Sequence, residues 1–151
     1  MGHARVFVVS TLPDQQVSFA LPLLRAQLPE LDLHRLRQFA FRLGEAGGPR
    51  RAGMLGVWRQ GREFPCGIVC YRVLEDLAAG EVLLAEHFVA MDLLDPDAVM
   101  AALIAEVEAL ALRMGCAGVR SIVHGPTRTV MARLLAAGYQ AEGLLMSKQI
   151  S

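Results

Sequence analysis

The apolar residues of this 151-residue chain follow two periods, one typical of strands and one typical of helices. Short β-branched runs bounded by glycine, proline or charge predict strands, and apolar residues three or four apart predict helices. The predicted order is a strand, two helices, three strands, a long helix, a strand, a helix and a strand. No linker-like tract interrupts this order, so we expect a single domain over residues 1–151.

The predicted strands are rich in valine, isoleucine and leucine. Glu86 and His87 are the only polar interruptions of the third strand of the central group, and the two-residue period of a strand places them on opposite faces. Gly61, in the turn RQGRE, suits the backbone angles of a hairpin turn. The predicted strands are Arg5–Ser10, two hairpin strands within Met54–Val73, Val82–Met91, Val119–Gly125 and Leu144–Ile150.

The predicted helices begin and end at recognisable residues. Pro13 and Asp14 suit a helix start, and Pro22 should divide this first helical region into two short pieces because it lacks an amide donor. The long helix is almost wholly apolar, which predicts burial, and its place between two strands is typical of a parallel crossover. The later helices are Asp32–Gly44, Pro96–Met114, ended by Gly115, and one within Thr127–Gln140, closed by Gly138.

Composition excludes several classes of protein. Fifteen basic residues balance fifteen acidic ones, which argues against a nucleic-acid partner. No stretch of 18 apolar residues predicts a membrane span, and the first apolar run is short for a signal peptide. The three cysteines lack the paired spacing of a zinc site, and His3, His34 and His87 have no partners at metal-ligand spacing. We therefore expect a cytoplasmic protein without a metal site.

Self-association is expected from the same composition. The net charge is zero, the mean hydropathy is +0.37 and the longest helix is almost uncharged, so little keeps two copies apart. A homodimer is the simplest closed assembly. Candidate apolar anchors are Trp58, Phe64 and Phe88.

Two phrases, VEALALRMGCAGVRSIVHG and RLLAAGYQAEGLLMSKQI, together with the order of elements, resemble the GNAT superfamily of acyl-CoA-dependent N-acyltransferases. The resemblance covers nearly the whole chain. It implies a single-domain α/β (α+β) fold, in which helices cover both faces of a central, mixed, mostly antiparallel twisted sheet. It also implies transfer of an acyl group from acetyl-CoA to a small-molecule or peptide amine.

The resemblance also implies a place for the cofactor. In the family, the pantetheine arm lies where the fourth and fifth strands diverge, and the diphosphate sits at the amino end of the central helix on a loop reading [QR]-x-x-G-x-[GA]. Asp95, Ala98 and Met100 occupy the three signature positions here, and none is the preferred residue. Thr127 falls where the family often has an asparagine, although it also suits a helix N-cap. The implied cofactor-binding residues are Ala90, Asp92, Asp95, Ala98, Val99, Met100 and Thr127.

The carboxylates of this loop change its expected chemistry. Asp95 suits an N-cap, Pro96 the first helical residue, and Asp97 an acid that complements the helix dipole. The helix is thus predicted to cap itself, in competition with phosphate. Repulsion from Asp92, Asp95 and Asp97 should cost about 1 kcal/mol per charge pair. We expect acetyl-CoA to bind weakly or not at all.

Catalysis requires a base for the amine and an acid for the departing thiolate. The family often places a tyrosine five residues before the closing aromatic residue, and counting back from Tyr139 reaches Leu134. The base candidates are Glu86 and His124, although Glu86 would also suit an arginine pair and His124 a cap or a solvent-facing group. Two functions stay open: an N-acetyltransferase, and a non-catalytic GNAT-like binding or assembly module with weakened or lost CoA binding.

Overall fold

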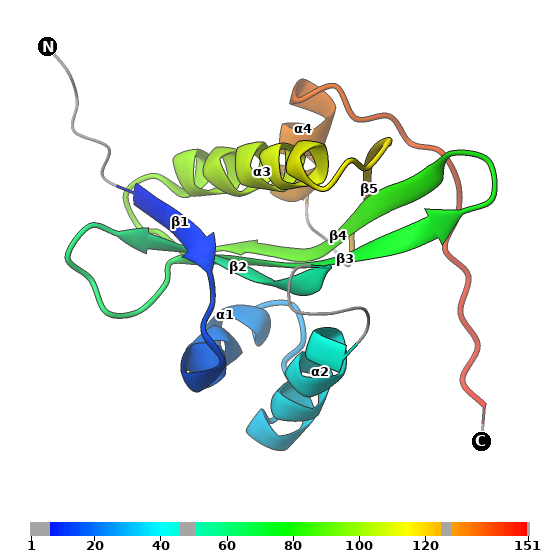
Figure 1. Ribbon diagram of the computed structural model, residues 1–151. Helices are drawn as coiled ribbons and strands as arrows, with labels where there is room; N and C mark the ends of the chain where they lie inside the picture. The colour runs from blue at the N-terminus through cyan, green and yellow to red at the C-terminus, as the bar shows by residue number, and fades with distance from the viewer. Residues whose placement is uncertain (1–6, 46–50, 125–127, 151) are drawn as a thin grey trace, which may run out of the picture.

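A computed structural model describes residues 7–45, 51–124 and 128–150. Its five strands form one sheet in the order β1-β2-β3-β4-β5 (Figure 1). Neighbouring strands are antiparallel except for β4 and β5, which are parallel, so the predicted mixed, mostly antiparallel sheet is confirmed. The strands are β1 (Phe7–Thr11), β2 (Ala52–Arg59), β3 (Gly67–Asp76), β4 (Gly80–Ala90) and β5 (Gly118–Ile122).

Helices cover both faces of this sheet, as predicted. The 3-10 helix η1, α1 and α2 lie on one face, and α3 and α4 lie on the other (Figure 1). The division expected at Pro22 is present, because η1 ends at Ala20 and Pro22 lies in the first turn of α1. The helices are η1 (Asp14–Ala20), α1 (Leu21–Leu24), α2 (Leu33–Glu45), α3 (Pro96–Arg113) and α4 (Arg128–Ala136).

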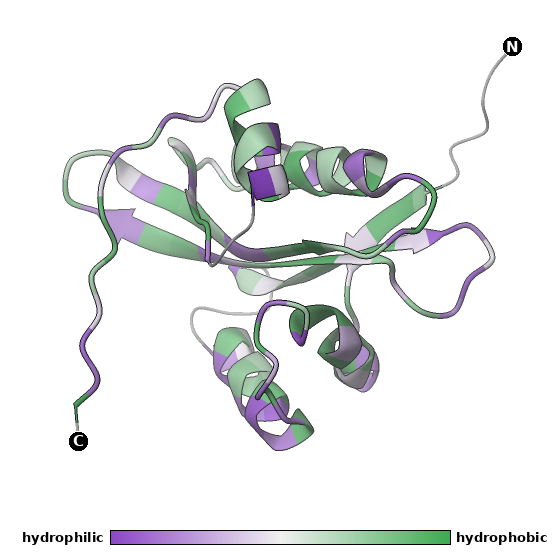
Figure 2. Ribbon diagram, turned by 180° about the vertical axis from the view of Figure 1, so that it is seen from behind, coloured by the Kyte–Doolittle hydropathy of each residue, from purple (hydrophilic) through white to green (hydrophobic). Residues whose placement is uncertain are grey.

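Helix α3 packs closely on the sheet because it is apolar and because Gly67 lies beneath it. Figure 2 shows mostly hydrophobic colours along α3, whereas α2 mixes hydrophobic and hydrophilic residues. A Cβ atom on Gly67 would lie 2.4 Å from Cγ1 of the fully buried Val99, so only glycine permits this approach. No helix in the described part of the chain is long and apolar enough to cross a membrane.

Strand β4 has one extra residue in its pairing with β3. Cys70 of β3 pairs with Glu86, but the next recorded pair joins Ile68 to Val89, so two steps along β3 oppose three along β4. His87 lies within this irregularity and has a φ of 62°, which is rare for a residue with a side chain. This arrangement is a β-bulge.

The bulge overturns the prediction that Glu86 and His87 point to opposite faces. Before it, Ala85 packs in the core beneath α3, and after it Phe88 does so. Residues on one face of a regular strand are two apart, whereas these two are three apart. The extra residue, His87, is thus removed from the alternation and its side chain lies beside that of Glu86.

The predicted strand Leu144–Ile150 is also wrong. Residues 140–150 form neither helix nor strand, and Figure 1 shows this segment running away from the sheet. Leu144 is 93% exposed and Met146 is 87% exposed. A strand needs a neighbouring strand to satisfy its backbone donors and acceptors. The composition of this segment favours a strand, but no described strand of the same chain pairs with it.

Candidate active site

The candidate site lies where β4 and β5 part. The parallel pairing runs from Val82 opposite Gly118 to Glu86 opposite Ile122, and it stops there. Strand β5 ends at Ile122, while β4 continues to Ala90 beside β3. His124 follows two residues after the end of β5, so the topology brings it to Glu86 across 38 residues of sequence.

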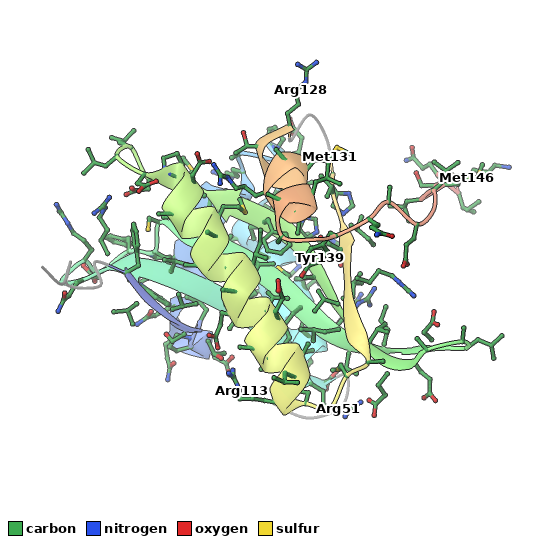
Figure 3. All side chains as sticks on the ribbon, turned by 90° about the horizontal axis from the view of Figure 1, so that it is seen from above. Arg51, Arg113, Arg128, Met131, Tyr139 and Met146 are labelled. Carbon is green, nitrogen blue, oxygen red and sulfur yellow. The ribbon has the colours of Figure 1, made fainter. Side chains whose placement is uncertain are left out.

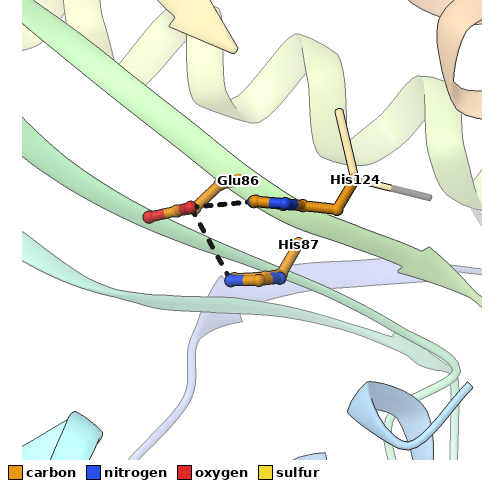
Figure 4. A group of neighbouring side chains, drawn as sticks. All are labelled: Glu86, His87 and His124. Atoms are coloured by element: carbon orange, nitrogen blue, oxygen red, sulfur yellow. Dashed lines mark hydrogen bonds and ion pairs between the residues drawn. The ribbon is translucent and has the colours of Figure 1, made fainter. Parts of the chain in front are cut away.

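Glu86 contacts two histidines at once. Its Oε2 atom lies 3.2 Å from Nε2 of His124 and 3.7 Å from Nε2 of His87. The two imidazole rings are stacked, with centroids 4.8 Å apart and planes within 9° of parallel (Figure 4). The predicted base candidates Glu86 and His124 therefore lie together, and Glu86 contacts histidines where an arginine was the alternative.

Burial and charge set the protonation of this cluster. Burial lowers the pKa of His87, the Glu86 carboxylate raises it, and His124 lowers it further, so the balance favours a neutral imidazole. Nδ1 of His87 is buried and has no hydrogen-bond partner among the described residues. Burial raises the pKa of the neighbouring Cys70 thiol to about 12, with a further contribution from Glu86, so this thiol stays protonated.

Sequence reasoning assigned His87 no role, whereas the structure places it beside Glu86 and His124. The assumption of a regular strand separated His87 from Glu86, and sequence spacing could not reveal the approach of His124. The available signal was a pair of polar residues inside an otherwise apolar strand, since bulges occur next to active sites and redirect a side chain there. His3 lies outside the described residues.

The loop after β4 is fixed by Asp92. Its Oδ1 accepts from Nε of Arg59 at 2.7 Å and its Oδ2 from Nη2 at 2.6 Å, while Oδ2 also accepts from the amide of Asp95 at 2.7 Å. The Arg59 guanidinium is the main reason why the pKa of Asp92 falls to about 2. Asp92 therefore holds the loop to β2.

The amino end of α3 caps itself, as predicted. Oδ1 of Asp95 accepts from the amide of Ala98 at 3.0 Å, and Pro96 occupies the first turn. Oδ2 of Asp97 lies 2.7 Å from Nη2 of Arg133 on α4. Since Asp92 and Asp97 both pair with arginines, the repulsion expected from three unpaired carboxylates is smaller than the sequence suggested.

No family model matches the sequence, and no curated protein matches it. Among solved structures, the aminoglycoside N-acetyltransferase AAC(6')-Iy in complex with CoA is similar, with a TM-score of 0.78, 14% identity, and coverage of 99% of this chain and 98% of that chain. Glucosamine-6-phosphate N-acetyltransferase from Arabidopsis thaliana gives a TM-score of 0.73 at 12% identity, covering 96% of this chain and 99% of that chain. The 6'-N-acetyltransferase AAC(6')-Ih from Acinetobacter baumannii gives 0.75 at 14% identity, with coverage of 96% and 99%.

The chain has the GNAT fold. The expected tyrosine of the last GNAT helix is replaced by Leu134, which is 5% exposed and belongs to the core. Tyr139 has a buried hydroxyl without a hydrogen-bond partner among the described residues, and burial, with Glu108, raises its pKa to about 12. Leu134 thus supplies no proton donor.

The cofactor positions implied by the GNAT resemblance differ in exposure. Val99 and Met100 are buried in the core, and the Val99 amide donates to the carbonyl of Asp95, so their side chains are closed to a ligand. Ala90 and Ala98 are partly exposed at the end of β4 and the start of α3. Thr127 lies outside the described residues.

Proposed function

We propose that this chain is an N-acetyltransferase that transfers an acetyl group from acetyl-CoA to an amine. The observation that carries the proposal is the 3.2 Å contact between Glu86 and His124 at the point where β4 and β5 part. The GNAT fold supports it, because the structures that share this fold include acetyltransferases, one of them in complex with CoA. Fold alone does not establish an activity, so the proposal depends on the paired carboxylate and imidazole as its support.

The proposed reaction needs one base. The amine nitrogen attacks the thioester carbonyl carbon, a carbon–nitrogen bond forms and the carbon–sulfur bond breaks. The amine proton passes to the Glu86–His124 pair, whose side chains are adjacent and partly buried. Because Leu134 replaces the usual tyrosine, the CoA thiolate takes its proton from water.

Acetyl-CoA is proposed to lie beside β4 with its diphosphate at the start of α3. The helix dipole favours an anion there. The amides of Asp95 and Ala98 already bond to carboxylates, so fewer donors remain for phosphate than in a glycine loop. We therefore propose weak binding through backbone amides.

The acceptor is proposed to be a small-molecule or peptide amine, and the active form a homodimer. The exposed apolar residues of the C-terminal segment support self-association, since such a surface is costly to leave in water. They are Leu144, Leu145, Met146 and Ile150.

Turnover with a panel of amines tests the enzyme. The protein is incubated with acetyl-CoA and each amine in the presence of a metal chelator, and released CoA thiol is measured with a chromogenic disulfide. We expect Glu86→Gln and His124→Ala to lower kcat/KM by about 10² to 10⁴-fold, the usual contribution of a general base. His34→Ala, on α2 outside the cluster, is the matched control and should retain activity.

Two results would contradict this proposal. Full activity in both variants would show that neither Glu86 nor His124 is the base, although the protein would still be an acetyltransferase. No turnover with any amine, together with no heat on calorimetric titration with acetyl-CoA, would favour the non-catalytic binding module.

A further inference from the structure

The cluster of Glu86, His87 and His124 brings three metal-ligand atoms close together. Each residue offers one atom, and these atoms all lie within 4.8 Å of one another. Figure 4 shows the two imidazole rings stacked one over the other, and the dashed lines from both rings end on the Glu86 carboxylate. Two imidazole nitrogens and one carboxylate oxygen form a ligand set that transition metals favour.

We propose that Glu86, His87 and His124 bind one zinc ion, with a fourth coordination position open to water or a ligand. Two nitrogens and a carboxylate with an open position are typical of catalytic rather than structural zinc sites. Mg²⁺ and Ca²⁺ prefer all-oxygen sites and should not compete. The proposal does not rest on acetyl transfer.

The two distances to Glu86 are close to those of a zinc site, whereas the three ligand atoms together spread over as much as 4.8 Å and the imidazole rings are stacked, so both rings must rotate toward the ion. Bonds of about 2.0 to 2.2 Å in a tetrahedron place neighbouring ligand atoms roughly 3.3 to 3.5 Å apart. The separation of 3.2 Å between Glu86 and His124 is close to this value. The separation of 3.7 Å between Glu86 and His87 needs to shorten by only a few tenths of an ångström.

Hydrogen bonding alone explains the position of His87 poorly. At 3.7 Å its Nε2 lies beyond a good hydrogen bond to Glu86, whose same oxygen is already 3.2 Å from His124. His87 also has a φ of 62°, a conformation that costs free energy in a residue with a side chain and that clusters at functional sites. A cation held by all three side chains would give this backbone conformation a function.

The surroundings also suit metal binding. The side chain of His124 is 35% exposed, so an ion has access from solvent. Nδ1 of His87 has no hydrogen-bond partner among the described residues, whereas ligating histidines usually have one, so we expect weaker binding than at a structural zinc site.

Titration of the intact protein with zinc tests this site without any substrate. Chelator-stripped protein is titrated with ZnCl2 by calorimetry, and the affinity is checked by competition with a chromogenic chelator. We expect one ion per chain, and no comparable heat with MgCl2. Glu86→Gln, His87→Asn and His124→Ala should each weaken binding at least tenfold, because each removes one ligand.

The variants are chosen so that a folding defect cannot imitate a lost ligand. Asparagine tolerates a positive φ, so His87→Asn keeps the bulge, and circular dichroism confirms the fold. His34→Ala and Cys66→Ser lie outside the cluster and should bind zinc like the wild type.

Three results would overturn the proposal. They are no zinc binding by the wild type, unchanged binding by His87→Asn, and a thiolate charge-transfer band in the cobalt-loaded protein, which would indicate cysteine ligands. Each leaves the acetyltransferase proposal standing, since turnover is measured with a chelator present. Loss of turnover alone likewise leaves the zinc site intact.

Discussion

At the residue scale, Asp92 connects three parts of the molecule. Its carboxylate binds the Arg59 guanidinium of β2, which in turn lies 5.0 Å from the centroid of the Phe7 ring of β1. The same carboxylate accepts from the amide of Asp95, just before α3. The loop at the start of the candidate cofactor site is thus tied to the sheet edge.

The Asp92 pair predicts a specific dependence of stability on pH. The pKa of Asp92 is lowered from 3.8 to about 2 in the folded protein, so its contribution is present above about pH 4 and is lost as the pH falls toward 2. Asp92→Asn should therefore be less stable than the wild type at neutral pH, and the difference should shrink below pH 4. Urea midpoints measured from pH 7 to pH 2 check this, with Glu142→Gln as the charge control. A difference that stays constant over this range would contradict the prediction.

Residue-level prediction succeeded where it depended on local chemistry. Asp95 was predicted as an N-cap because aspartate before proline at a helix start has few other roles, and the structure confirms it. The partners of Asp92 and His87 were not predictable, because Arg59 lies 33 residues before Asp92 and the bulge breaks the alternation of β4. Contacts between side chains far apart in the sequence depend on the register of the sheet strands, and the spacing of residues along the chain does not reveal that register.

At the element scale, the amino end of α3 is capped by Asp95, although this is the end where we propose that the diphosphate binds. Asp97 at its first turn pairs with Arg133, and Glu106 near its other end pairs with Arg113. These two exposed ion pairs are alike in geometry and differ in their distance from the proposed diphosphate. They offer a matched comparison.

Asp97→Asn should strengthen acetyl-CoA binding. The change removes a negative charge beside the proposed diphosphate and releases Arg133. Because Arg133 already offsets part of the repulsion, the gain should be at most about 1 kcal/mol, or roughly fivefold in affinity. Glu106→Gln, at the opposite end of α3, should leave the affinity unchanged. Calorimetric titration with acetyl-CoA measures both. Equal affinities for the wild type and Asp97→Asn would show that repulsion from Asp97 does not limit binding.

The elements themselves were largely predictable. Helix α3 was found because its apolar pattern is long and ends at Gly115, which has the positive φ of 73° that glycine favours. Leu144–Ile150 was wrongly predicted as a strand because composition reports the preference of a segment and not the presence of a neighbouring strand.

At the scale of the whole molecule, the apolar anchors suggested by the sequence differ in exposure. Phe88 is 2% exposed and belongs to the core, and Phe64, although 60% exposed, contacts the ring of Phe19. Several further exposed apolar side chains lie in the C-terminal segment, and Figure 3 shows Met146 far from the helices. A groove of about 1030 Å³ lies between β5, α4 and residues 137–145.

We expect the protein to form a homodimer through this segment. Among the described residues β5 pairs only with β4, so its other edge has unpaired backbone groups that a second copy's Leu144–Ile150 would satisfy. Light scattering at tens of micromolar should give a dimer for the wild type. A chain ending at Gly143, and the variant Met146→Lys, should shift the mass toward a monomer, whereas Leu77→Lys, at an equally exposed leucine in the β3–β4 turn, should not. A monomeric wild type would refute self-association, and a dimer in the shortened chain would place the interface elsewhere.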